Sequence, residues 1–221
     1  KDKMKLDIIY KLFIDKTSHL LKLIGANINT VPVLDLRIKR SSNIIGDRSF
    51  SKKVNTVSKM GDLCIKLFHE NSIGTIIKHI PGHGLAKVDS HNFTPIVNKS
   101  LKYLKKNDFS VFKKKECFFA MTGHVIYKNI DKLNTATHSK KVINHIRKII
   151  GFKNIIISDD LSMKSLKDSM GENTVKSFKA GCNIVLHCNS NLAEMKIVAE
   201  NSPLISSFII KKTSQFYKIL S

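Results

Sequence analysis

The chain has 221 residues, 42% of them hydrophobic, and a net charge of +21. This length suits one large domain or two small ones with a normal core. No uncharged apolar run reaches the roughly 18 residues of a membrane span, so no membrane partner is expected. The basic opening segment is not followed by a small-residue cleavage site, so we expect no signal peptide.

The positive charge comes almost entirely from lysine, since arginine occurs only at positions 37, 40, 48 and 147. Proteins that read nucleic acids usually rely on arginine, whose planar guanidinium binds bases and phosphates in a bidentate way. We therefore expect no specific nucleic-acid partner. Lysine-rich stretches such as 101–118 would still favour loose, salt-sensitive binding of polyanions.

The four cysteines form no C-x-x-C pair, and three of them lie in or beside apolar runs; they are Cys64, Cys117, Cys182 and Cys188. This pattern is typical of reduced, buried thiols rather than of a disulfide framework, and it favours a cytoplasmic protein.

In chain order, five short apolar runs predict buried strands at 28–36, 74–80, 117–125, 154–160 and 182–189. They are continuously apolar rather than alternating, which is typical of parallel strands covered on both faces.

Segments with helical periodicity lie between these runs. Residues 54–70 place apolar side chains near one stripe, and residues 138–152 do the same before Gly151, a predicted helix stop. This alternation of strand and helix indicates repeated βα units. Without a sequence repeat or a low-complexity linker, we expect one domain over residues 1–221.

Polar groups gather where the predicted strands end: Asp35, Lys78, His79, His124, Asp159, Asp160 and His187. In a (β/α)₈ barrel these ends share one face, and in an open doubly wound sheet they share one edge. Either architecture brings the polar groups together.

The loop 76–93 holds three histidines and permits three kinds of chemistry. His79 and His83 have the spacing of a metal-binding pair, but Pro81 and Gly82 between them would break the helix that this spacing needs. Ser90 lacks the G-x-S-x-G setting of a hydrolase nucleophile.

Acid/base catalysis is the third kind of chemistry that the loop 76–93 permits. Asp89 and His91 are two residues apart, so the carboxylate could orient the imidazole. Alone, "DSH" is more typical of a turn or helix cap, and Asp159 in "SDDLSM" is equally typical of a helix start.

Six blocks in order resemble family 3 glycoside hydrolases, and more narrowly the bacterial β-N-acetylglucosaminidases of cell-wall recycling. They are "VPVLDL", "IGDRSF", "KHIPGHG" with "DSH", "MTGHVIY", "SDDLSM" and "AGCNIVLHCN", between about residues 20 and 190.

The resemblance implies specific roles. Asp159 would be the nucleophile, His91 the general acid/base held by Asp89, and Arg48, Lys78 and His79 would bind the sugar. It implies hydrolysis with retention of terminal β-linked N-acetylglucosamine in peptidoglycan fragments such as anhydro-muramyl disaccharides, with no metal or organic cofactor.

The family's barrel has eight strands, and "VLD" marks the fourth. The resemblance therefore implies an α/β fold of the (β/α)₈ TIM-barrel type that is incomplete, an N-terminally truncated copy with five of eight strands. Residues 1–25 would be the preceding helix, 26–190 the βα units and 191–221 a helical, weakly ordered tail. A partner chain could supply the missing half; a non-catalytic remnant that binds only sugar or polyanions is the alternative.

Overall fold

The computed structural model describes residues 2–38, 45–86, 88, 90 and 93–220. Its helices are α1 (Asp2–Leu23), α2 (Val54–Glu70), α3 (Leu101–Lys106), α4 (Lys140–His145), α5 (Met170–Ala180), α6 (Leu192–Glu200) and α7 (Ser207–Leu220). Its strands are β1 (Ile28–Asn29), β2 (Gly74–Ile80), β3 (Ile96–Val97), β4 (Phe119–Thr122), β5 (Ile126–Tyr127), β6 (Ile155–Asp160) and β7 (Ile184–Leu186).

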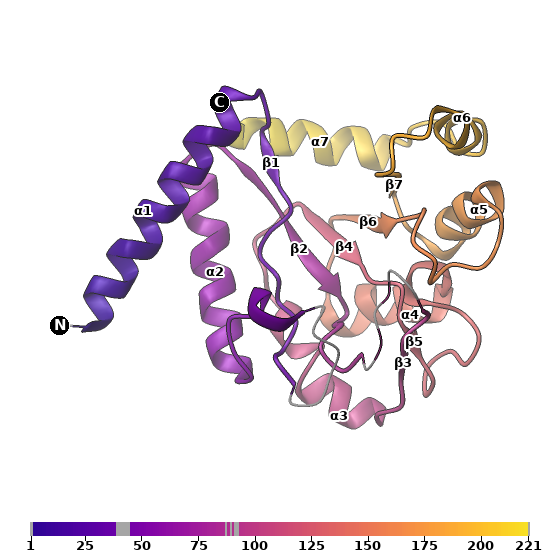
Figure 1. Ribbon diagram of the computed structural model, residues 1–221, viewed down its shortest axis with the longest axis horizontal. Coiled ribbons are helices and arrows are strands. Elements are labelled where there is room, and N and C mark those ends of the chain that lie inside the picture. The colour runs from indigo at the N-terminus through magenta and orange to yellow at the C-terminus, as the bar shows by residue number, and fades with distance from the viewer. Residues whose placement is uncertain (1, 39–44, 87, 89, 91–92, 221) are drawn as a thin grey trace.

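Five parallel strands form one curled sheet in the order β1-β2-β4-β6-β7 (Figure 1). Each of the five predicted strands is present, and an α/β fold with an incomplete barrel is confirmed. The predicted run 28–36 was too long for β1, because Pro32 lacks an amide hydrogen and interrupts regular pairing. Pairing resumes where the Leu34 N–H donates to the Lys78 carbonyl at 2.7 Å. The small β3-β5 sheet was not predicted.

The two faces of the sheet pack against different partners, because side chains alternate along each strand. Ile77, Ala120 and Ile156 are aligned across the strands and join the core shared with α2 and α4. Their neighbours Ile76, Phe119, Met121, Ile155 and Ile157 form the opposite, inner face.

Helix α7 packs on this inner face. Phe216 is buried there, with its ring centroid 5.0 Å from that of Phe119. The sequence predicted a helical, weakly ordered tail over 191–221; the segment forms α6 and α7 and is helical to Leu220. Burial of the Phe216 ring against the inner face explains the order that its local sequence did not indicate.

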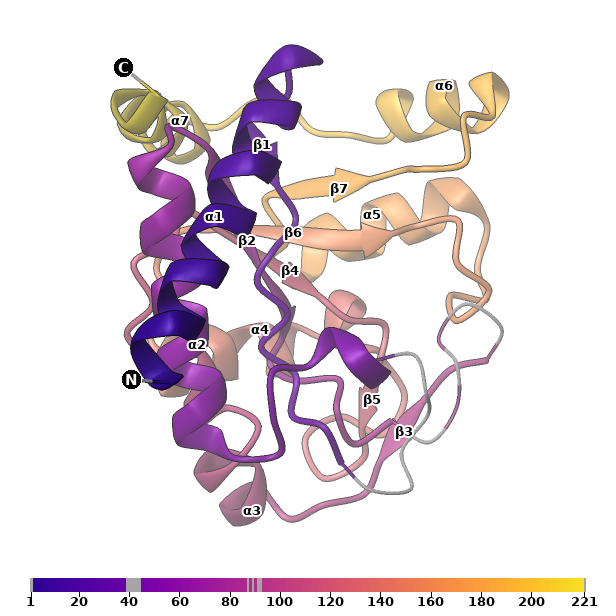
Figure 2. The ribbon, with the colours of Figure 1, turned by 60° about the vertical axis from the view of Figure 1, so that its left-hand side comes forward.

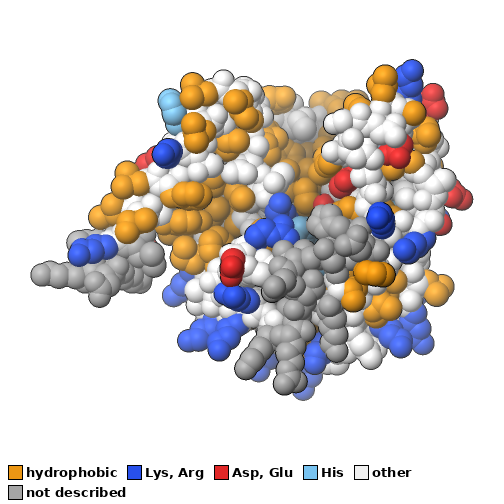
Figure 3. All heavy atoms as spheres, in the orientation of Figure 1, with side chains coloured by type: hydrophobic (Ala, Val, Ile, Leu, Met, Phe, Trp, Pro, Cys, Tyr) orange, Lys and Arg blue, Asp and Glu red, His pale blue; other side chains and the backbone are white. Residues whose placement is uncertain are grey.

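The two edge strands of the sheet are β1 and β7. Helix α1 lies beside the β1 edge, and α6 lies beyond the β7 edge (Figure 2). Helix α1 buries Ile14 against α2 but exposes a second apolar face, and hydrophobic side chains gather over it (Figure 3). Most exposed large apolar side chains in the described residues lie on α1, α6 and α7 or in the segments that follow α1 and α6: Ile8, Ile9, Leu12, Phe13, Leu20, Leu23, Ile24, Leu192, Met195, Ile197, Leu204, Ile205, Phe208, Ile210 and Tyr217.

Local sequence signals set several helix ends. Gly151 adopts φ +84° after the π-helical turn Ile146–Ile150, as the predicted helix stop requires. Ser169 and Glu172 form a reciprocal capping box at the start of α5. Within the described part of the chain, none of the helices has the length and apolar content that crossing a bilayer requires.

Candidate active site

The buried carboxylate of Asp35 organises the turn that follows β2. Its oxygens accept the His79 backbone N–H at 3.2 Å, the His79 ring Nδ1–H at 2.7 Å and the His83 backbone N–H at 2.6 Å. Burial acts to raise the pKa of Asp35, but His79 and these donors outweigh it and hold the pKa below its usual range. Asp35 therefore remains an anion that fixes both ends of the turn.

The same contact aims His79 at the end of β6. With Nδ1 bound to Asp35, the opposite ring nitrogen, Nε2, lies 3.9 Å from Oδ2 of Asp159. Burial raises the pKa of Asp159, yet His79 and His124 outweigh it and keep the pKa below the usual range. The result is an ionised, partly exposed carboxylate held beside an oriented imidazole.

The adjacent carboxylate, Asp160, has a different environment. Its oxygens accept the Ser162 hydroxyl at 2.6 Å and the Cys188 backbone N–H at 3.0 Å, which links the ends of β6 and β7. His124 is fully buried, with Nδ1 2.8 Å from the Thr137 hydroxyl and Nε2 2.9 Å from the Asp160 carbonyl. Asp160 and His124 thus shape the frame behind Asp159.

Lys78 and Arg48 both line a cavity of about 480 Å³ between α1, β1 and the end of β2. Ser49 fixes the segment that carries Arg48, because its hydroxyl donates to the Asp35 carbonyl at 2.6 Å. Burial lowers the pKa of Lys78, Asp159 opposes this effect and Arg48 adds to it. The charges of Lys78, Arg48 and Asp159 therefore influence one another at this end of the strands.

His83 is buried, and its Nε2 forms a 3.1 Å hydrogen bond with the Ser90 hydroxyl. Burial, with His79 adding to it, lowers the pKa of His83 to about 4, so this ring is neutral at neutral pH. No three His, Cys, Asp or Glu side chains among the described residues are placed to hold one metal ion. Asp89 and His91, the predicted acid/base pair, lie outside the described residues.

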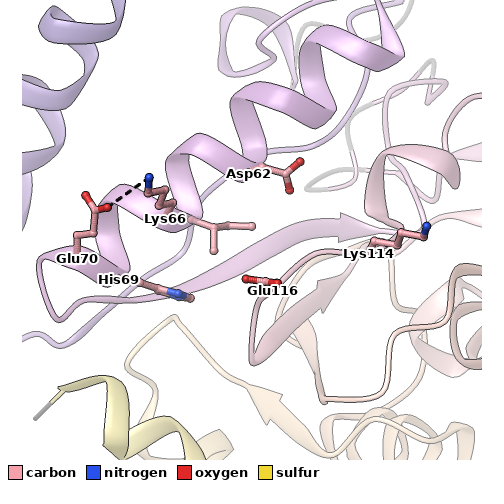
Figure 4. A pocket seen from close by; sticks show the side chains of 7 residues that line it. Asp62, Lys66, His69, Glu70, Lys114 and Glu116 are labelled. Atoms are coloured by element: carbon pink, nitrogen blue, oxygen red, sulfur yellow. Dashed lines mark ion pairs between the residues drawn. The ribbon is translucent and has the colours of Figure 1, made fainter.

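A second pocket lies at the amino ends of β2 and β4, at the opposite end of these strands from the residues above (Figure 4). Its charges are largely paired: Lys66 with Glu70 at 3.7 Å, and Asp62 with Lys115 at 2.9 Å. His69 points toward Glu116 across the pocket. Such a self-neutralised lining makes it a weaker candidate for a functional site.

Sequence reasoning placed Asp35 at a strand end but did not predict that it would hold His79 and His83. The motif "VLDL" gives no local signal of this role, since the acceptor and its donors are 44 and 48 residues apart. Two further residues, Asp108 and Tyr127, were not predicted from the sequence. They contact Gly82 in the turn 79–83, on the side away from Asp35.

A model of the glycosyl hydrolase family 3 N-terminal domain matches residues 2–213. The chain belongs to glycoside hydrolase family 3. The resemblance predicted from the ordered motifs is therefore confirmed at the level of the family.

Curated relatives match over part of their length. The β-hexosaminidase of Idiomarina loihiensis is 31% identical over 184 residues, which are 81% of this chain and 55% of the relative. That of Nitrosomonas eutropha is 32% identical over 174 residues, 76% of this chain and 50% of the relative. The chain thus spans about half the length of these relatives.

Solved structures share the fold. Native NagZ from Neisseria gonorrhoeae has a TM-score of 0.79 at 28% identity and is matched over 92% of this chain and 59% of its own. A family 3 β-N-acetylglucosaminidase from a Paenibacillus strain has a TM-score of 0.81 at 23% identity, over 95% of this chain and 43% of its own.

Proposed function

We propose that the chain carries the catalytic face of a retaining β-N-acetylglucosaminidase. The observation that carries this proposal is the Asp35–His79–Asp159 arrangement, in which an ionised carboxylate lies beside an oriented histidine at the strand ends. Lys78 and Arg48, on the same face, supply donors for sugar hydroxyls. Membership of family 3 supports the reaction class, and the β-hexosaminidase names of the relatives support N-acetylglucosamine as the sugar.

The reaction would proceed in two displacements. An Asp159 oxygen attacks the anomeric carbon while the bond to the leaving oxygen breaks, and protonated His91 gives its proton to that oxygen. Neutral His91 then takes a proton from water, which attacks the same carbon and releases the Asp159 carboxylate. Two inversions give net retention. Asp89 would orient the imidazole through both steps.

The substrate we propose is a peptidoglycan fragment with terminal β-1,4-linked N-acetylglucosamine on anhydro-muramic acid, cleaved in the cytoplasm. Four free cysteines, three of them buried, agree with a reducing compartment.

The open edges at β1 and β7 point to completion by further barrel strands. Exposed apolar side chains on α1 and α6 flank these edges, and parallel strands are normally covered on both faces. A second copy of the chain would bring another charge of +21 to the interface. A partner chain with three parallel βα units and less positive charge therefore fits better.

The alternative is a non-catalytic remnant that binds sugar or polyanions, which the lysine-rich charge favours. Hydrolysis of a chromogenic β-N-acetylglucosaminide separates the two. We expect turnover that Asp159→Asn abolishes and that Glu70→Gln, which removes an exposed carboxylate at the opposite end of the strands, retains.

If the folded chain alone is inactive, the same assay is repeated after addition of the part of the gonococcal relative that the chain does not match. Turnover that appears on addition and disappears in Asp159→Asn would support completion. Sugar binding without turnover under both conditions would support the remnant.

A further inference from the structure

The turn 79–83 is held from two sides. On one side, Asp35 accepts the backbone N–H groups of His79 and His83. On the other side, Asp108, in the segment after α3, packs against Gly82: a Cβ at Gly82 would lie 2.8 Å from the Cβ of Asp108. The Tyr127 hydroxyl donates to the Gly82 carbonyl. Asp108 and Tyr127 therefore close the turn against Asp35.

The environment of Asp108 is unusual for a carboxyl group. The residue is 2% exposed, and neither carboxyl oxygen has a hydrogen-bond partner of normal geometry among the described residues. The titratable groups that act on it are Asp35, from the segment after β1, and Tyr127, from β5. No cation of the described residues forms an ion pair with it.

A negative charge at this position would be both desolvated and repelled. An unpaired carboxylate in an apolar interior costs much more free energy than the neutral acid. Burial, with Asp35 adding to it, raises the pKa of Asp108 to about 7, although its own backbone N–H offsets a part of this. Ionisation of Asp108 would therefore favour a displacement of the turn 79–83, because the displacement would let water reach the carboxylate.

We propose that Asp108 is a positioning residue that, as an uncharged acid, fixes the turn carrying His79 and His83 against Asp35. It touches no substrate in the proposed reaction and acts through the turn. The inference rests on the proposed function only for its effect on turnover; the conformational claim concerns the chain itself.

If Asp108 only filled space, any side chain of similar volume could replace it, and its ionisation would not change the conformation of the turn 79–83. Asparagine, which matches Asp108 in shape but does not ionise, separates charge from volume.

The test is a pH titration of the His83 ring resonances by NMR, from about pH 5.5 to 8.5. With a pKa of about 4, His83 does not itself titrate in this range, so a midpoint there reports a neighbouring group. The His79 ring, whose centroid lies 5.5 Å from that of His83, is also a neighbour, and the Asp108 variant tells the two apart. We expect a midpoint near pH 7 in the unaltered chain. Asp108→Asn should remove it and hold the resonance at its low-pH position.

Asp131→Asn is the matched control, because Asp131 is also buried but its carboxylate is bound by Ser139 and Asn134. The midpoint near pH 7 should persist in that variant. A midpoint that persists in Asp108→Asn with the same pH and amplitude would overturn the proposal. If that variant does not fold, the unaltered chain decides: an Asp108 carboxyl ¹³C shift that already has the carboxylate value at pH 5.5 overturns it.

The NMR measurement does not depend on turnover, so its result can be interpreted even if the chain has no glycosidase activity. In an active assembly, kcat/KM should fall as pH rises through about 7, and Asp108→Asn should move that fall to higher pH with less than about a tenfold loss at pH 6. Asp108→Leu, which fills the space without polar atoms, should lose more than Asp108→Asn.

Discussion

Replacing Asp35 with asparagine tests the framework on which the site depends. Asparagine keeps the size of Asp35 but presents one oxygen and one NH₂ group where the carboxylate presents two acceptors. With the amide oxygen accepting the backbone N–H groups, the new NH₂ group faces Nδ1 of His79, so either two donors meet or the His79 ring changes tautomer. In either case the charged acceptor is lost, and the turn distorts or His79 loses its present tautomer and orientation.

The magnitude follows from the bonds lost. Hydrogen bonds to a charged acceptor contribute about 1.5–3 kcal/mol each, and an unpaired buried donor costs about 1–3 kcal/mol. Loss of one or two such bonds predicts a decrease of about 2–5 kcal/mol in the free energy of unfolding at pH 7. The free energy of unfolding of an ordinary domain is about 5–15 kcal/mol, so the variant would be strongly destabilised.

Urea unfolding, followed by circular dichroism from pH 3 to 7, measures this effect. Because the folded state lowers the pKa of Asp35, its contribution is present above its unfolded-state pKa and is lost as pH falls through the folded-state value. The difference between Asp35→Asn and the unaltered chain should therefore shrink in acid. A loss below about 1 kcal/mol at pH 7 would contradict the role assigned to Asp35.

Three further outcomes are expected. His91→Ala should slow hydrolysis of activated aryl glycosides less than that of natural substrates, since a good leaving group needs little protonation; equal losses in steady-state assays would contradict the acid role. Asp108→Asn should gain stability relative to the unaltered chain as pH rises from about 4 to 8, by at most ~4 kcal/mol, because the raised pKa makes folding less favourable over that range. A difference that is constant with pH in urea titrations would argue against a neutral Asp108. Gly84→Ala should cost about 1–3 kcal/mol, because overpacking strains the backbone. The new Cβ would lie 2.1 Å from the Leu36 carbonyl oxygen, whereas Gly171→Ala in α5, beside a flexible side chain, serves as the tolerated control in thermal melts.

Much of the fold could be predicted from local pattern. The five apolar runs became the five strands of the sheet, and Gly151 ends its helix as predicted, because apolar runs and glycine's access to positive φ act within a few residues. Convergence of polar groups at the strand ends also follows from parallel topology alone. The order of the motifs was sufficient to predict the family.

Other features depend on contacts between distant segments. The sequence "SDD" does not say which carboxylate faces His79; the register of β6 turns Asp159 to the face shared with Ile155 and Ile157. Asp108 is an ordinary loop residue until the chain brings it against Gly82, 26 positions earlier in the sequence.

Helix α7 is a further case, because only burial on the inner face gives Phe216 its role. Periodicity and turn propensity act between near neighbours and therefore predict elements. Which side chains meet, and with what charge, is decided by packing and burial, which exist only in the tertiary structure.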